Sequence, residues 1–285
     1  MKKTYFFTFL LAIFIMIMAF PALANSGASD AVIQARKSVF RVIVSDTDGI
    51  YSGSCFIISS DMEGTFLATN FHVVKNEPSS VIGILSHDEN ILPASIVHYN
   101  ELYDVCLLKT DEPIENAAPL TIALAEEITI GQAIYALGFP EKADYLMDKF
   151  SYHYDEVSLT NGIINSIRSK DYDDATSFSL LQINSVINPG NSGGPLLNES
   201  GHVVGINTMG VVGADGIYGA VHVKHLEELL IQSGVLYYLP AEEEPQKTFW
   251  DNNMMVLIVG VLITVVGFVL LILDRRRVAP AAADN

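Results

Sequence analysis

The chain has 285 residues, half of them hydrophobic, and it carries 33 acidic against 16 basic residues for a net charge of −17. This length fits one or two domains. So large an excess of acid repels a phosphate backbone, which argues against nucleic acid as a partner. Two cysteines without a neighbouring cluster of ligands cannot complete a tetrahedral zinc shell, so no metal site is expected. We expect no other cofactor either.

Residues 1–24 have the pattern of a secretory signal peptide. Lys2 and Lys3 precede a largely apolar run over residues 5–20, and an Ala-x-Ala exit follows at 22–24. We expect cleavage after Ala24. An uncleaved anchor helix is the alternative, because the apolar run is rather long for a signal peptide.

A second apolar run, residues 254–273, contains twenty residues without a charge. As a helix it is long enough to cross a hydrocarbon core of roughly 30 Å. The arginines at 275–277 follow it, and Trp250 precedes it at a position typical of the membrane interface. We expect a transmembrane helix with a cytoplasmic tail over 274–285, which places residues 25–253 on the extracytoplasmic side, periplasmic or extracellular. A buried core helix is the alternative.

Between the two apolar ends, short β-rich segments separated by turn residues dominate the chain. Many short strands at even spacing are typical of an all-β sandwich or barrel, and about 200 residues accommodate two barrels of about 100. We expect one barrel over about 39–112 and a second over about 126–221, joined near 111–125. The expected strands are 39–44, 54–59, 65–69, 81–85, 91–99, 105–109, 133–137, 162–167, 180–183, 195–197, 202–207 and 216–221.

Two helices accompany the strands. One is a short N-terminal helix over 29–38, and the other covers 222–233, where apolar residues share one face and Gly234 ends the helix. The polar stretch 141–158 is expected to be a surface loop. Residues 239–253 form a linker that begins with a polar, proline-flanked segment and leads to the predicted span.

Cys55 and Cys106 are the only cysteines. In an exported domain they could form a disulfide, but spacing alone does not show whether their Cα atoms come within bonding range. Two buried free thiols are the equally open alternative.

The run from Gly190 to Pro195 places Ser192 in a backbone too tight for bulky residues. Flanking glycines allow backbone N–H groups to turn towards one point beside the hydroxyl, as a serine nucleophile with an oxyanion hole requires. The same residues also favour an ordinary turn.

A serine nucleophile needs a general base and a carboxylate that orients it. His72 stands at the end of an apolar strand, where an imidazole can be partly buried and neutral at pH 7. Asp104 follows thirty-two residues later, directly before another apolar strand, where a carboxylate is costly without a partner. The order His72, Asp104, Ser192 is that of the chymotrypsin class.

Together, the segments around His72, Asp104 and Ser192 resemble those of the HtrA/Deg family of trypsin-like serine proteases. The resemblance rests on residues 187–198 and 201–208 around and after Ser192, 69–74 around His72 and 104–109 after Asp104, with weaker likeness at 53–58 and 160–164. It covers about residues 30–232, within a protease domain expected over 25–238.

The resemblance implies two packed six-stranded β-barrels with the catalytic site between them. It implies that Ser192 attacks a peptide carbonyl while His72 accepts its proton and Asp104 orients His72. The backbone N–H groups of Gly190 and Ser192 are implied to form the oxyanion hole.

The resemblance also implies a substrate pocket. Val186 stands six residues before the nucleophile, where trypsin carries an aspartate, and this predicts a pocket for small or medium aliphatic side chains. The other expected walls of this pocket are Asn207, Thr208, Gly219 and Ala220.

The chain departs from the family in two respects. Only the 222–233 helix and the linker separate the protease domain from the predicted span, so no PDZ domain is expected within this chain. The predicted span is C-terminal, whereas membrane-bound relatives are commonly anchored at the N-terminus. The short stretch 25–38 leaves the family's homo-trimer uncertain.

We expect a membrane-anchored serine endopeptidase whose protein or peptide substrates are exported, misfolded or membrane-proximal. The alternative from another class is a catalytically silent or gated module that keeps the protease fold and acts in binding or regulation.

Overall fold

The computed structural model describes residues 28–47, 49–75, 80–172, 177–210 and 216–241, together with isolated positions between 258 and 272. The chain divides into two units, residues 1–240 and 241–285. The predicted signal peptide, most of the linker, much of the predicted span and the tail lie outside the described residues.

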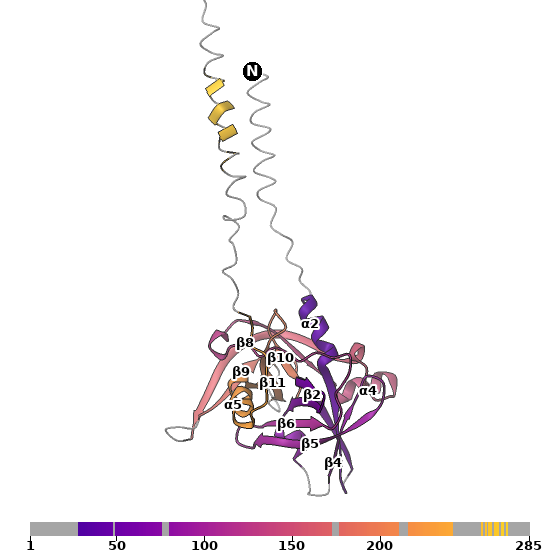
Figure 1. Cartoon of the computed structure of the whole chain (residues 1–285). Helices are drawn as coiled ribbons and strands as arrows, with labels where there is room; N and C mark the ends of the chain where they lie inside the picture. Colours follow the sequence, from indigo (N-terminus) through magenta and orange to yellow (C-terminus); the bar gives the residue numbers. More distant parts are fainter. Residues whose placement is uncertain are drawn as a thin grey trace, which may run out of the picture. The chain divides into compact units, whose positions relative to one another are not determined.

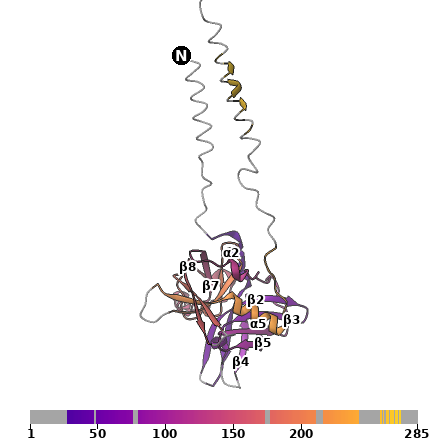
Figure 2. The same ribbon diagram turned by 90° about the vertical axis from the view of Figure 1, so that its left-hand side faces the viewer.

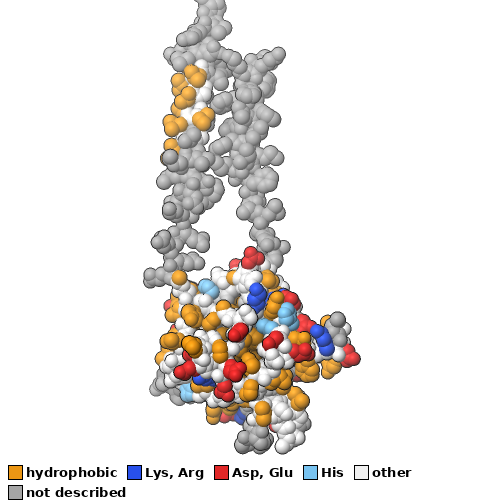
Figure 3. Space-filling view, turned by 45° about the vertical axis from the view of Figure 1, so that its right-hand side comes forward, with side chains coloured by type: hydrophobic (Ala, Val, Ile, Leu, Met, Phe, Trp, Pro, Cys, Tyr) orange, Lys and Arg blue, Asp and Glu red, His pale blue; other side chains and the backbone are white. Residues whose placement is uncertain are grey.

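No helix among the described residues is both long and apolar enough to cross a bilayer. The isolated described positions within the predicted span are helical. Their apolar side chains are exposed, as the orange atoms in Figure 3 show.

The first half of the folded unit is a closed six-stranded antiparallel barrel with the strand order β1-β2-β3-β6-β5-β4 (Figure 1). Its strands are β1 (Val39–Ser45), β2 (Ile50–Asp61), β3 (Gly64–Thr69), β4 (Val81–Leu85), β5 (Ile91–Asn100) and β6 (Val105–Thr110).

The second half is another closed six-stranded barrel with the order β10-β11-β12-β9-β8-β7. Its strands are β7 (Ala133–Gly138), β8 (Ser158–Asp171), β9 (Ser177–Ile183), β10 (Pro195–Leu197), β11 (Val203–Gly210) and β12 (Tyr218–His222). The predicted pair of barrels is confirmed, and Figure 2 shows the unit from the side. β2 and β8 extend beyond their predicted bounds, because backbone pairing with neighbouring strands continues past the apolar stretch that marks each strand in the sequence.

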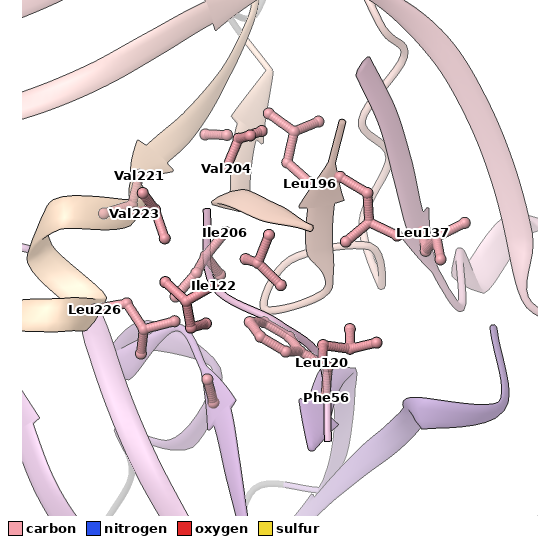
Figure 4. Packing of buried hydrophobic residues seen from close by; sticks show 14 of the residues in the cluster. Phe56, Leu120, Ile122, Leu137, Leu196, Val204, Ile206, Val221, Val223 and Leu226 are labelled. Atoms are coloured by element: carbon pink, nitrogen blue, oxygen red, sulfur yellow. The ribbon is translucent and has the colours of Figure 1, made fainter. Parts of the chain in front are cut away.

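Residues 55–58 of β2 and 105–108 of β6 are consecutive apolar residues, because both faces of these two strands pack against apolar side chains. Phe56 of β2 and Leu107 of β6 face the cluster that fills the second barrel and the seam between the barrels. Cys55 and Cys106, one position earlier on each strand, face the interior of the first barrel. Both faces of these strands are therefore buried, and Figure 4 shows Phe56 beside residues of the second barrel.

The two cysteines are free and buried, so the disulfide alternative is not realised and the structure matches the reading of two free thiols. Burial in the apolar interior raises the pKa of the Cys106 thiol to about 12, with a further contribution from the charge of Asp104. Burial likewise raises the pKa of the Cys55 thiol. Both side chains behave as small hydrophobic residues.

The connection between the barrels, which contains η2 (Ala125–Glu127), is bound to both of them. The N–H of Leu120 donates to Ile57 of β2, and the N–H of Ala123 donates to Val203 of β11, at 3.0 and 2.9 Å. The predicted junction therefore helps to fix one barrel against the other.

Both predicted helices are present. The N-terminal one is α2 (Asp30–Ala35), capped by the Ser29 hydroxyl and continued by η1 (Arg36–Ser38). The other is α5 (Val223–Ser233), which ends at Gly234 with a φ of 69°. α5 belongs to the second half of the chain but also contacts β5 and β6 of the first barrel.

The predicted loop over 141–158 is wrong in part, because α4 (Glu141–Met147) and η3 (Tyr154–Glu156) lie within it. α4 has a distant partner, because its Asp144 pairs with Arg41 of β1, whereas η3 is closed by a local capping box between His153 and Glu156. A partner about a hundred residues away leaves no periodic pattern in the local sequence.

His222 and His225, at the start of α5, are buried. The Nε2 atom of His225 accepts a hydrogen bond from the N–H of Ser179 at 2.8 Å, which requires an imidazole without a proton on that nitrogen. Burial, aided by the nearby charge of Lys224, lowers the pKa of each histidine to about 4.

These histidines make the fold less stable in acid. The unfolded chain binds protons as pH falls below about 6.5, whereas the folded protein does not bind them until about 4. We therefore expect the melting temperature to fall between these pH values and to be constant above them as far as these two groups are concerned. The variant His225→Gln, which keeps an acceptor for Ser179, should show a weaker fall in circular dichroism melts, and His98→Gln should match the wild type. An unchanged slope in His225→Gln would contradict this prediction.

Candidate active site

Ser192 lies in the turn between β9 and β10, and two glycines give the turn its shape. Gly190 has a φ of 96°, and a Cβ atom there would lie 2.3 Å from the Phe139 carbonyl oxygen. Gly193 has a φ of 87°, and a Cβ atom there would lie 2.1 Å from the Ser54 carbonyl oxygen. Any side chain at either position would be strained and would clash with backbone.

Ser54 of β2 holds this turn against the first barrel. Its N–H donates to the Ser192 carbonyl at 2.8 Å. Its hydroxyl donates to the Gly190 carbonyl at 2.7 Å and accepts from the Phe139 N–H at 2.9 Å. The side chain is fully buried, so these bonds are shielded from competition with water.

The peptide between Pro189 and Gly190 has a defined orientation. The Pro189 carbonyl accepts a hydrogen bond from the Glu141 N–H at 2.9 Å. Because the peptide is trans, the Gly190 N–H points the opposite way. In the described part of the chain neither this N–H nor that of Ser192 has an acceptor, as donors of an oxyanion hole require.

β-Sheet register brings His72 and Asp104 together. His72 lies in the single turn of α3 (Phe71–Val74), which follows β3, rather than on the strand itself. Asp104 directly precedes β6, and β3 pairs with β6 so that Thr69 lies opposite Cys106. His72 Nδ1 lies 2.7 Å from Asp104 Oδ2, and the His72 backbone N–H donates to Oδ1 at 2.8 Å.

An ionised carboxylate can only accept, so Nδ1 of His72 carries the proton and Nε2 remains an acceptor. Among the described residues Nε2 has no hydrogen-bond partner. The His72 side chain is 50 % exposed, so it is open to an incoming group. These properties are those of a general base.

Thr208 of β11 connects the Asp104 carboxylate to the Ser192 turn. Its hydroxyl donates to Asp104 Oδ2 at 2.9 Å, and its carbonyl accepts from the Ser192 hydroxyl at 2.9 Å. In the described structure Ser192 therefore donates to Thr208 and not to His72. A cavity of about 430 Å³ is lined by Phe71, His72, Lys75, Glu101, Asp104 and Thr208.

The residues expected to form the pocket lie in different environments. Val186 is 42 % exposed, whereas Ala220 belongs to the hydrophobic core and Gly219 is buried in β12. Asn207 is fully buried, and its amide nitrogen donates to the Leu137 and Pro195 carbonyls at 3.0 and 3.2 Å. The side chains of Asn207 and Ala220 therefore do not line an open pocket, because cross-strand packing turns them inwards.

The sequence pattern assigns no role to Ser54 and places Thr208 only in a wall of the predicted pocket. A serine in the apolar run of β2 was the available signal for Ser54. No local signal exists for Thr208, because its partner Asp104 lies 104 residues away on the other barrel.

A model of the trypsin-like peptidase domain family matches residues 53–206, more than half of the chain. The chain therefore belongs to this family, and its fold and site define it as a protein of the trypsin-like serine peptidase class.

The chain is similar to curated proteases of the same class. It is 32 % identical over 160 residues to the chloroplastic Protease Do-like 1 of Arabidopsis thaliana, and the aligned region covers 55 % of this chain and 33 % of that protein. It is 35 % identical over 168 residues to a probable periplasmic serine endoprotease, DegP-like, of Halomonas elongata, covering 59 % and 31 %. The chain thus spans about a third of the length of these relatives.

Solved structures agree with this assignment. The serine endoprotease from Yersinia pestis superposes with a TM-score of 0.55 at 26 % identity, covering 71 % of this chain and 65 % of that one. An HtrA-type protease with a tripeptide superposes with a TM-score of 0.56 at 27 % identity, covering 72 % and 62 %. Within the trypsin-like family the similarity is therefore to HtrA-type endoproteases.

The hydrogen bond from Thr208 to Asp104 generates a prediction. The variant Thr208→Val keeps the shape of the side chain but removes the donor, and a hydrogen bond to a charged group contributes about 1.5–3 kcal/mol. We expect the rate at which a fluorophosphonate labels Ser192 to fall about tenfold or more, while Thr208→Ser stays near the wild type. Equal labelling rates in folded Thr208→Val and wild type would exclude this contribution of Thr208.

Proposed function

We propose that the protein is a serine endopeptidase that hydrolyses peptide bonds through an acyl-enzyme formed on Ser192. The observation that carries the proposal is the pair of His72 and Asp104, whose geometry leaves Nε2 of His72 as a free acceptor. The turn around Ser192, with the N–H groups of Gly190 and Ser192 unengaged within the described residues, supports it. Membership of a family of peptidases supports it further.

In the proposed mechanism, the Ser192 hydroxyl leaves the Thr208 carbonyl and donates to Nε2 of His72. The oxygen attacks the substrate carbonyl as its proton passes to His72, and Asp104 stabilises the imidazolium that forms. The N–H groups of Gly190 and Ser192 bind the oxyanion, and losing one such donor typically costs about 10²–10³ in rate. His72 then protonates the leaving amine, and water hydrolyses the acyl-enzyme by the reverse sequence of proton transfers.

A gated or silent protease module is the second candidate, and one observation favours the gated form. The Ser192 hydroxyl is engaged with the Thr208 carbonyl at 2.9 Å, so a rotation of the serine side chain must precede attack. The substrate itself is sufficient to induce such a rotation if it offers a better geometry for the hydroxyl.

The proposal predicts that a fluorophosphonate labels the wild-type protein at neutral pH and does not label Ser192→Ala. His72→Ala should be labelled at most at a trace rate, because no base then removes the serine proton. Labelling is read by mass spectrometry, which also locates the modified residue. A folded wild type that stays unlabelled, and that also fails to degrade casein at raised temperature, would leave only the silent module.

We further propose that the residue on the acyl side of the cleaved bond is a small or medium aliphatic one. Val186 stands where trypsin carries an aspartate that binds basic side chains. Cleavage of a peptide library by the wild type should show this preference. Preferred cleavage after arginine or lysine would reject it.

We also propose that residues 254–273 anchor the protease to the cytoplasmic membrane, with the catalytic domain on the extracytoplasmic side. The uncharged apolar run and the arginines after it support this placement. Its substrates would then be exported proteins that are misfolded or close to the membrane.

The anchor predicts that the full chain stays in the membrane pellet after carbonate extraction, whereas a chain that stops after residue 240 is released. Both should be labelled by the fluorophosphonate, because the catalytic residues all precede residue 240. Recovery of the full chain in the carbonate supernatant would refute the anchor without affecting the proposed chemistry.

A further inference from the structure

Arg41 of β1 is a charged side chain that is completely buried. Its guanidinium forms a two-pronged ion pair with Asp144 of α4, with Nη1 to Oδ2 at 2.8 Å and Nη2 to Oδ1 at 3.0 Å. The rings of Phe139 and Phe150 lie 5.4 and 5.0 Å from its central carbon. Such a buried pair is a weak source of stability, because desolvation offsets most of the attraction, so its presence calls for another explanation.

Asp144 also ties together the segment in which it lies. Its Oδ1 atom accepts from the backbone N–H and the hydroxyl of Ser151, at 3.0 and 2.7 Å. The carboxylate therefore joins the first barrel, through Arg41, to α4 and to the chain that follows it. The side chain is 14 % exposed, so this junction is nearly dry.

The other end of the same segment holds the turn around Ser192. The Glu141 N–H, at the start of α4, donates to the Pro189 carbonyl, and the Phe139 N–H reaches the Gly190 carbonyl through the Ser54 hydroxyl. Arg41 lies against the Phe139 ring, so it touches this segment at both Phe139 and Asp144.

We propose that Arg41 and Asp144 are positioning residues that hold segment 139–144 so that Glu141 keeps the Pro189 carbonyl away from the oxyanion site. Gly190 has a φ of 96°, which a glycine leaves easily, so the peptide before it can rotate once Glu141 withdraws. Rotation would replace the Gly190 N–H by a carbonyl that repels the oxyanion. This inference rests on the proposed function, since it names what maintains the oxyanion donor of the same site.

If the Arg41–Asp144 pair only stabilises the fold, its removal should leave activity unchanged. One double variant distinguishes this stabilising role from the proposed positioning role. In Arg41→Met with Asp144→Asn, both charges disappear and no buried ion is left unpaired, so the fold should survive with a melting temperature close to the wild type. The amide that replaces the carboxylate on α4 no longer has a guanidinium to hold it in place. If the pair only stabilises the fold, the double variant should be as active as the wild type.

The experiment uses the full chain in detergent and compares four proteins: the wild type, the double variant, Arg41→Lys, and Lys149→Gln. The last is a matched control, because it breaks the Lys149–Glu156 ion pair of 2.7 Å elsewhere in the same polar stretch. The readouts are the melting temperature, kcat and KM on one peptide substrate, and hydrogen exchange of the amides in 188–193.

We expect the double variant to lose at least about tenfold in kcat with little change in KM, because the missing oxyanion donor acts only in the transition state. Its amides in 188–193 should exchange faster than in the wild type. Arg41→Lys should have an intermediate kcat, since an ammonium keeps the positive charge but cannot make the two parallel hydrogen bonds that the guanidinium makes to Asp144. Lys149→Gln should match the wild type in both kcat and exchange.

A double variant that melts like the wild type and keeps both its kcat and its exchange rates would overturn the inference. A folded wild type that hydrolyses no peptide, stays unlabelled by the fluorophosphonate and also fails to degrade casein at raised temperature would instead refute the proposed function. In that case the exchange rates still decide whether the Arg41–Asp144 pair orders the turn, so the two failures are distinguishable.

Discussion

The hydrogen bonds of Ser54 hold the turn around Ser192 against the first barrel, and the geometry of the candidate site depends on them. A buried hydroxyl donates to Gly190 and accepts from Phe139, while the N–H of the same residue binds the Ser192 carbonyl. A turn rich in glycine has many accessible conformations, and ordering it costs more entropy than ordering other residues. Fixed partners on a rigid strand select one of these conformations, in which the Gly190 N–H is directed away from Glu141.

The second requirement is that residues from two barrels meet. His72 and Asp104 come from the first barrel, where the pairing of β3 with β6 sets their separation. Ser192 and Thr208 come from the second, and Thr208 contacts both Asp104 and Ser192. The seam that carries Phe56, the connecting segment and α5 is therefore part of the site, because a small shift between the barrels would separate the carboxylate from Thr208.

Much of this arrangement was predictable. The strands are recognisable because β-rich apolar segments alternate with turn residues. His72 and Asp104 are recognisable beside apolar strands, and Ser192 within a glycine-rich run. What local pattern does not predict depends on distant partners. α4 lies where a loop is predicted, and its Asp144 pairs with distant Arg41, while the amide of Asn207 donates to Leu137 and Pro195 in the interior.

The sequence by itself determined the class of fold, the order of the three candidate catalytic residues and the glycines on which the turn depends, since each leaves a local pattern of composition or spacing. Only the tertiary structure decided that the two cysteines are free, that the Ser192 hydroxyl bonds to Thr208, and that Arg41 finds its counter-charge on α4. The reason is physical. A hydrogen bond or an ion pair depends on distances of a few ångströms between atoms, and for residues far apart in the chain only the packed fold sets those distances.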